Sequence, residues 1–390
     1  MSSLGPLFAT NDRTTVQGDL NVIVNVTNHS WVDVPVDASP IIANPEEPRR
    51  ANATLVMLAR NSDLEGVVQS VRSMEDRFNR KYGYPWVILN EEPFTAEFIQ
   101  RITTLTDNPI EFGLIPSEHW YQPDWIDEDL ATEGRRKMEA QRIIYAGSVP
   151  YRNMCRFNSG FFFQHELLQP YQYYWRVEPD VNFFCDLDYD PFLFMQDNDK
   201  VYSFTISLYE WEPTIPTLWS AVKEFMHKYP HYIAENNSME FLSDDGGHSY
   251  NLCHFWSNFE IADMDFWRSE AYTKFFDYLE SKGGFYYERW GDAPVHSIAA
   301  SLFARKDQVH FFNDSLDGTV YTMLALGAWR APSDEVDALF IADSPTSPDF
   351  LFWMLCHALV SSRRRELPAN LNLLSRAPSL GFRSTRAPPL

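Results

Sequence analysis

Two carboxylates, Glu178 and Asp180, flank a proline directly after the aromatic segment Tyr171–Val177. Proline breaks a helix interior and restricts the residue before it, so an extended segment that ends in a turn is expected. Divalent cations such as Mg²⁺ and Mn²⁺ prefer oxygen ligands, and when protein carboxylates bind them they keep other coordination positions open for phosphate oxygens. The pair therefore predicts a metal site that holds a diphosphate. The alternative interpretation is an acidic turn whose ion-pair partner is Arg176.

A third carboxylate, Glu260, stands in the segment Asn258–Phe266, whose pattern is typical of a strand. On a strand, the side chain of Glu260 points opposite to those of Phe259 and Ile261. Aromatic residues precede this segment, so the carboxylate is expected to be partly removed from water. A desolvated carboxylate can serve as a base or a nucleophile. The alternative is a single charged residue on an exposed strand face.

A fourth acidic residue, Asp292, is followed by Pro294 in a pattern typical of a helix N-terminus. From this pattern Asp292 is expected to cap the helix, and His296 is expected to be a packed or capping residue. Tyr151 belongs to an aromatic set within residues 151–175 whose expected place is the core. Stacking of some of these rings on sugar faces is the alternative.

Hydrophobic periods indicate the elements that must position these residues. Short apolar runs at Ala53–Arg60, Trp86–Asn90 and Ile110–Pro116 are typical of strands. The helices expected between and after them are 64–78, 94–105, Asp127–Tyr145, Pro216–Lys228 and Arg268–Lys282, with further strands at Val201–Ser207 and Asn258–Phe266. Alternation of strands and helices predicts an α/β fold with a mostly parallel central sheet. Ligands bind outside the carboxyl ends of such strands, where Glu178 and Asp180 are expected.

Composition narrows the class of protein. The 390 residues include 54 acidic and 32 basic ones, and the net charge of -22 repels nucleic-acid phosphates, so no nucleic-acid partner is expected. A hydrophobic fraction of 45% supplies a sizeable core. No run of about 20 apolar residues occurs, so no membrane span is expected in this chain. Residues 1–50, rich in proline and polar residues, are expected to form a stalk or linker.

The chain resembles the fungal α-1,2-mannosyltransferases of glycosyltransferase family 15, also called glycolipid 2-α-mannosyltransferases. The resemblance lies in four long segments: YRNMCRFNSGFFF, YYWRVEPDVNFFCDLDYDPF, YNLCHFWSNFEIADMDFWRS and GGFYYERWGDAPVHSIAASLF. It implies a GT-A-type nucleotide-sugar transferase fold and transfer of mannose from GDP-mannose to a mannose 2-hydroxyl of glycoprotein or glycolipid glycans. It also implies retention at the anomeric carbon, Mn²⁺ as cofactor and the Golgi lumen as location, where family members build N- and O-linked mannans.

The resemblance also implies residue roles, by matching motifs. The acidic pair stands where many GT-A enzymes carry Asp-x-Asp, so Glu178, aided by Asp180, resembles the metal ligand. Glu260 matches the proposed nucleophile of the family. The residues predicted to bind substrate are Tyr151, Arg176 and Asp292. Retention proceeds through a covalent intermediate or by same-face attack, and the sequence leaves both routes open.

The resemblance covers Ala53–Asp314 and predicts a catalytic domain at residues 51–314. After this point, family members continue with a Gly-Tyr-His-His segment that supplies a histidine metal ligand, whereas here no histidine occurs between His310 and His357. Residues 315–390 are therefore predicted to be a poorly ordered tail that does not follow the family.

Two functions stay open on this basis. One is a mannosyltransferase, which the altered tail would impair. The other is a non-catalytic pseudoenzyme that binds a nucleotide or mannose. A glycoside hydrolase would account for paired carboxylates but not for the aromatic motifs.

Overall fold

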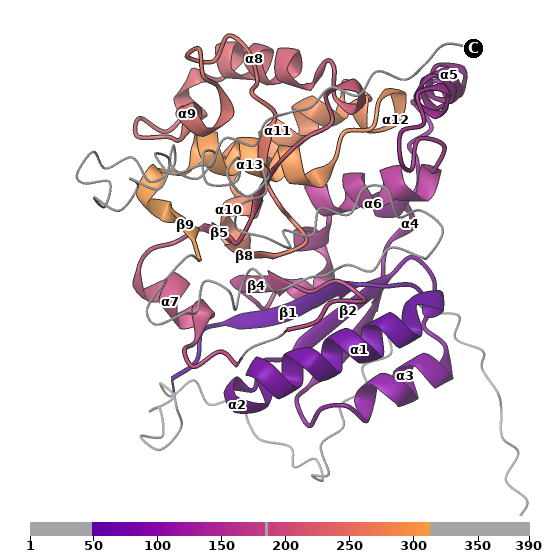
Figure 1. Ribbon diagram of the computed structural model, residues 1–390, viewed down its shortest axis with the longest axis vertical. Coiled ribbons are helices and arrows are strands. Elements are labelled where there is room, and N and C mark those ends of the chain that lie inside the picture. The colour runs from indigo at the N-terminus through magenta and orange to yellow at the C-terminus, as the bar shows by residue number, and fades with distance from the viewer. Residues whose placement is uncertain (1–48, 184–185, 313–390) are drawn as a thin grey trace, which may run out of the picture.

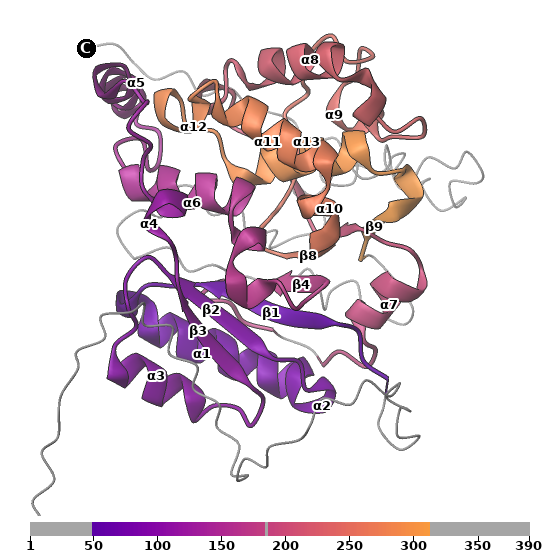
Figure 2. The ribbon, with the colours of Figure 1, turned by 180° about the vertical axis from the view of Figure 1, so that it is seen from behind.

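The computed structural model describes residues 49–183 and 186–312 (Figure 1 and Figure 2). Its central feature is a seven-stranded sheet in the order β3-β2-β1-β4-β8-β5-β9. Strand pairs in this sheet are parallel except those that β8 makes with β4 and β5. The predicted α/β fold with a mostly parallel sheet is therefore confirmed. The predicted tail, and all but the end of the predicted stalk, lie outside the described residues.

Short strands make up the two sheets. The central sheet consists of β1 (Ala53–Leu58), β2 (Trp86–Asn90), β3 (Ile110–Leu114), β4 (Tyr173–Arg176), β5 (Tyr202–Phe204), β8 (Glu260–Asp263) and β9 (Val309–Phe311). A second sheet pairs β6 (Ser207–Tyr209) with β7 (Cys253–Phe255) in antiparallel fashion.

Helices cover both faces of the central sheet. One face carries α1 (Leu64–Met74), α2 (Arg80–Tyr82) and α3 (Ala96–Thr103), and the opposite side carries α6 (Val149–Gly160), α11 (Glu270–Glu280) and α13 (Asp292–Phe303) (Figure 1). The other helices are α4 (Ser117–Trp120), α5 (Glu128–Ala140), α7 (Pro191–Asp197), α8 (Leu218–Lys228), α9 (Met239–Leu242), α10 (Met264–Arg268) and α12 (Gly284–Tyr287). In the part of the chain that the structure describes, no helix combines the length and apolarity needed to cross a membrane.

In the N-terminal half, strands and helices form close to their predicted limits. Alternation along β1 divides its side chains between two cores. Leu55 and Met57 pack with residues of α1 and α3, whereas Val56 packs with residues of α6 and α13. The helix predicted at 64–78 continues through a π-helical turn and α2, and it ends at Gly83, whose φ of 73° suits glycine.

The C-terminal half departs further from the predicted elements. The strand predicted at Val201–Ser207 splits into β5 and the start of β6. The strand predicted at Asn258–Phe266 ends at Asp263, because the Asp263 carboxylate accepts a 2.8 Å hydrogen bond from the Asp265 amide and so begins α10. The helix predicted at Asp127–Tyr145 ends at Ala140.

Helix α6 lies outside every helix that the hydrophobic period predicts. It buries polar side chains at positions where an apolar stripe is expected: Arg152, Asn153, Arg156 and Asn158. Each of the two arginines donates to backbone carbonyls, and Arg156 also donates to Glu280. Tertiary hydrogen bonds therefore stabilise this helix, although its sequence has no apolar stripe that marks the buried face.

The antiparallel strand β8 determines where the candidate residues meet. Trp175 pairs with Ile261 and Phe204 pairs with Glu260. Because β8 runs against β4 and β5, its first residue lies at their carboxyl ends. Glu178 follows the end of β4, so the predicted metal-binding turn and Glu260 lie on the same edge of the sheet. This is the edge where ligands bind in α/β folds.

Candidate active site

The carboxylate of Glu260 is the centre of the site. The residue is 1% exposed, and the hydroxyl groups of Tyr174 and Tyr202 donate to its Oε1 at 2.6 Å and its Oε2 at 3.1 Å. Burial and the adjacent negative charge of Glu260 raise the pKa of both tyrosines well above the ordinary value, so both remain donors. The alternative of an exposed strand face is therefore wrong. The carboxylate is desolvated and held by hydrogen bonds.

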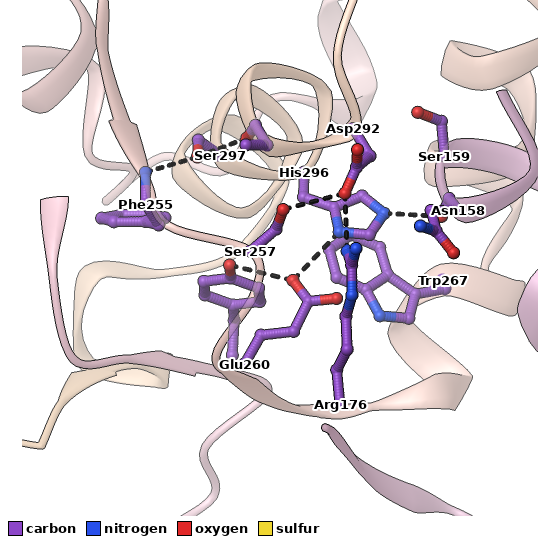
Figure 3. Close-up of polar contacts among 12 residues, drawn as sticks. Asn158, Ser159, Arg176, Phe255, Ser257, Glu260, Trp267, Asp292, His296 and Ser297 are labelled. Atoms are coloured by element: carbon purple, nitrogen blue, oxygen red, sulfur yellow. Dashed lines mark hydrogen bonds and ion pairs between the residues drawn. The ribbon is translucent and has the colours of Figure 1, made fainter. Parts of the chain in front are cut away.

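A histidine completes this centre (Figure 3). His296 of α13 is fully buried, with Nδ1 3.1 Å from Glu260 Oε2 and Nε2 3.0 Å from the backbone oxygen of Asn158. Its ring stacks on Trp267 with centroids 4.4 Å apart. The expectation of a packed residue is right about burial but misses the contact with Glu260. A signal exists in the sequence: His296 and Asp292 share one face of a mostly apolar helix at i, i+4 spacing.

A buried ion pair joins β4 to α13. Arg176 Nη1 donates to Asp292 Oδ2 at 2.6 Å, and the Ser257 hydroxyl donates to the same oxygen at 2.8 Å. Burial alone would raise the pKa of Asp292. The charge of Arg176 and the hydrogen bonds that Arg176 and Ser257 donate act against burial and contribute to a pKa below the ordinary value. The predicted N-cap role of Asp292 is wrong, since Gly291 is the N-cap residue and the Asp292 side chain turns to Arg176 instead. The guanidinium brings a full positive charge to its hydrogen bond with Asp292, whereas a helix N-terminus offers neutral backbone N–H groups.

Arg176 also contacts the predicted metal-binding turn. Its Nε donates to Glu178 Oε1 at 2.5 Å, and the side chain of Glu178 is 17% exposed. The ion pair named as the alternative to metal binding is therefore present. Asp180 has a φ of 61°, and a Cβ at Gly66 would lie 2.7 Å from its carboxylate. Asp180 thus turns toward the first turn of α1 rather than toward Arg176.

The donor chemistry of this turn suits the Mn²⁺ that the resemblance implies. The carboxylate of Glu178 is partly exposed, and carboxylate oxygens are hard ligands of the kind that a cation of this class prefers. One oxygen of Glu178 already accepts from Arg176, which orients the carboxylate as outer hydrogen bonds orient metal ligands. Across residues 49–183 and 186–312, no three side chains of histidine, cysteine, aspartate or glutamate gather as a metal-binding group.

Tyr151, the remaining predicted site residue, lies in the first turn of α6. Its ring stacks on Tyr145 with centroids 4.7 Å apart, and the guanidinium of Arg289 lies 5.1 Å from its centroid. The negative charge of Asp292 is among the influences that raise the pKa of Tyr151, after Cys155 and burial. The structure therefore places Tyr151 in the electrostatic surroundings of Asp292.

A pocket opens on these groups at the carboxyl ends of β1, β2 and β4. Its polar lining consists of Glu260, Arg176 and Asn158. The rest of the lining is apolar or aromatic: Val56, Leu58, Leu89, Phe157, Phe162 and Tyr174. The lining combines charged groups with rings, and this combination suits a ligand that is polar at its edges and apolar on its faces, as a sugar is.

Known proteins match the chain over most of its length. Residues 12–322 match the family model described as glycolipid 2-alpha-mannosyltransferase. The chain is 56% identical over 284 residues to a glycolipid 2-alpha-mannosyltransferase of Candida albicans, which covers 73% of this chain and 62% of that protein. It is 53% identical over 333 residues to an O-glycoside alpha-1,2-mannosyltransferase of Schizosaccharomyces pombe, with 84% of this chain and 83% of that protein covered. The chain therefore spans less than two thirds of the Candida protein.

Solved structures of similar sequence share the fold. A core-mannan synthase A of Aspergillus fumigatus, in a form with Mn and GDP, superposes with a TM-score of 0.67 at 45% identity, covering 70% of this chain and 75% of that one. A mannosyltransferase of Saccharomyces cerevisiae in complex with GDP gives a TM-score of 0.66 at 46% identity, with 68% and 70% covered. These structures confirm the predicted GT-A-type nucleotide-sugar transferase fold.

Proposed function

The chain belongs to the glycolipid 2-alpha-mannosyltransferase family, and from this premise we propose that it is a retaining α-1,2-mannosyltransferase. In this proposal it moves mannose from GDP-mannose to a mannose 2-hydroxyl of a glycoprotein or glycolipid glycan. We assign the activity to the domain at residues 51–314 and place it in the Golgi lumen, as the family resemblance implies. The names of the relatives and the GDP in the matched structures support the donor and the acceptor class.

The observation that carries the proposal is the buried carboxylate of Glu260, which lines the pocket at the carboxyl edge of the sheet. Transfer with retention builds positive charge at the anomeric carbon, and a carboxylate close to that carbon stabilises it. Tyr174 and Tyr202 fix the carboxylate by donating to it, so little reorganisation is needed when charge develops. Glu260 is therefore the proposed catalytic residue.

The other predicted residues have supporting roles in this proposal. Glu178, aided by Asp180, would hold Mn²⁺, which when bound neutralises the charge of the GDP diphosphate. Arg176 orients Glu178 and Asp292 through the two hydrogen bonds that it donates. Asp292 and Tyr151 bind the substrate in this proposal through their polar groups, the carboxylate and the phenolic hydroxyl.

Release of GDP from GDP-mannose in the presence of Mn²⁺ tests the proposal, with and without an α-mannoside acceptor. A transferase releases GDP faster when the acceptor is present, and the product carries a new α-1,2 linkage. A pseudoenzyme binds Mn²⁺-GDP but releases no GDP in either condition. A hydrolase releases GDP at the same rate without the acceptor. Either of the last two results would overturn the proposed function.

A further inference from the structure

We propose that His296 is held as an imidazolium that keeps Glu260 ionised, which makes it a positioning residue of the site. The histidine acts through Glu260 and not on the substrate. The kinetic consequence rests on the proposed function, whereas the protonation state of the ring does not. The inference starts from the two atoms that the ring nitrogens face.

The geometry of the hydrogen bonds shows that one of the two nitrogens of the His296 ring is protonated. Nε2 lies 3.0 Å from the backbone carbonyl oxygen of Asn158, and a carbonyl oxygen accepts hydrogen bonds but donates none. Nε2 therefore carries hydrogen. Nδ1 lies 3.1 Å from Glu260 Oε2, so a second proton must sit between these two atoms. The pair is either an imidazolium with a carboxylate or a neutral imidazole with a carboxylic acid.

The groups around Glu260 favour the ionised form. The hydroxyl groups of Tyr174 and Tyr202 both donate to Glu260. An ionised carboxylate accepts these two hydrogen bonds better than a neutral carboxylic acid does. The positive charge of Arg176, on the neighbouring strand β4, acts on Glu260 as well. With two tyrosine hydroxyls donating to it and the positive charge of Arg176 acting on it, Glu260 is stabilised as an anion.

The groups around His296 favour its charged form. The Trp267 ring stacks on the imidazole at an interplanar angle of 24°, and a cation gains from the face of an indole. Asp292, one turn earlier on α13, is a second negative charge that acts on His296. Tyr272 of α11 and Phe162 contact the ring from the remaining sides and bring no positive charge. An ion pair buried this completely requires both members, because either charge without the other would be expensive.

The consequence for transfer follows directly. A neutral carboxylic acid at position 260 would stabilise positive charge at the anomeric carbon far less than a carboxylate does. By holding the proton on its own ring, His296 keeps Glu260 charged and fixes its rotamer. Loss of the imidazolium should therefore lower kcat while binding of GDP-mannose changes little.

Nitrogen NMR of the imidazole rings tests the protonation state without any substrate. The His296 resonances are assigned by their absence in His296→Asn. At pH 7.5, about one unit above the ordinary histidine pKa, the parent protein should show both His296 nitrogens protonated, and Glu260→Gln should convert the ring to the neutral form. A neutral ring in the parent protein at this pH would overturn the proposal.

Kinetics test the consequence. His296→Asn keeps an N–H group near Glu260 without the charge, and His296→Phe removes both. We expect kcat to fall about tenfold in the first and about a hundredfold in the second, with KM for GDP-mannose within about threefold. The acid limb of the kcat profile should move to higher pH in both. His165→Asn is the matched control, since His165 is also a buried histidine that faces a backbone carbonyl, that of Leu114.

The outcomes separate the two proposals. Unchanged kcat in His296→Phe, or an equal loss in His165→Asn, would overturn the role of His296. Failure of the parent protein to transfer mannose at all would overturn the proposed function, and the NMR result would still decide the charge of His296.

Discussion

The two acidic regions on the carboxyl edge of the sheet are built in different ways. The turn with Glu178 and Asp180 comes from a few consecutive residues after β4, and it remains partly open to solvent. The centre at Glu260 gathers side chains from β4, β5, β8, α10 and α13, and its carboxylate is buried. A local, partly exposed turn suits an exchangeable metal and its nucleotide. A buried, hydrogen-bonded carboxylate suits the chemistry at the anomeric carbon.

Arg176 is the link between the two regions. Its Nε donates to Glu178 and its Nη1 donates to Asp292. Although burial opposes its charge, the carboxylates around it raise the pKa of Arg176 well above the ordinary value, so it remains a cation. The comparison therefore predicts that changes in the buried centre affect rate and stability, whereas changes in the turn affect binding of metal and GDP.

The largest expected effect is on the chemical step. Glu260→Gln keeps the shape of the side chain and removes its charge, so kcat should fall by about a thousandfold while KM changes little. The measurement is steady-state transfer from GDP-mannose. Glu111→Gln, a half-buried glutamate on strand β3, is the control and should keep the parent rate. A kcat within about threefold of the parent would assign Glu260 a structural role only.

The buried ion pair should dominate stability. Asp292→Ala leaves Arg176 buried without that partner, and loss of one member of a buried pair costs about 3–5 kcal/mol. Urea unfolding should show this loss. Glu65→Ala breaks the ion pair between Arg101 and Glu65, whose side chain is 78% exposed, and it should lower the free energy of unfolding far less. Equal losses in the two variants would contradict the contrast between buried and exposed pairs.

Binding should depend on the turn. Glu178→Ala should weaken Mn²⁺-dependent GDP binding by about tenfold or more, because the proposed ligand of the metal is lost. Calorimetry with Mn²⁺ and GDP measures this change. The matched control is Asp186→Ala. Asp186 is an exposed acid that follows Glu178 closely in the sequence, and it pairs with Arg77. If both variants bind Mn²⁺-GDP as the parent does, the metal is held elsewhere.

The smallest expected effect is the acid dependence of stability. The pKa of Asp292 is lower in the folded protein than in the unfolded chain, so its contribution is present above the unfolded value. That contribution is lost as pH falls below about 4, the ordinary aspartate range, through the folded pKa. Asp292→Asn should therefore flatten the fall in unfolding free energy below that pH. A parallel fall in both proteins would exclude Asp292 as a source of acid sensitivity.

The same contrast explains what the sequence could predict. The first strands, their helices and the turn at Glu178 are local patterns, and all were predicted close to their observed place. The pairing of Arg176 with Asp292 joins residues 116 positions apart, and the local pattern around Asp292 favoured a helix cap instead. The placement of Glu260 required the register of β8, and the partner of His296 lies 36 positions away. Such contacts follow from tertiary packing, which periodicity cannot predict.

The most direct test of the account is a crystal structure of the Glu260→Gln protein with Mn²⁺ and GDP-mannose. The substitution should slow transfer enough to keep the donor intact. We predict that the anomeric carbon lies about 3–3.5 Å from the residue 260 side chain, a distance typical of reacting atoms, while the diphosphate lies beside Glu178. A donor sugar held away from the pocket of Glu260, with another carboxylate against its anomeric carbon, would contradict the account.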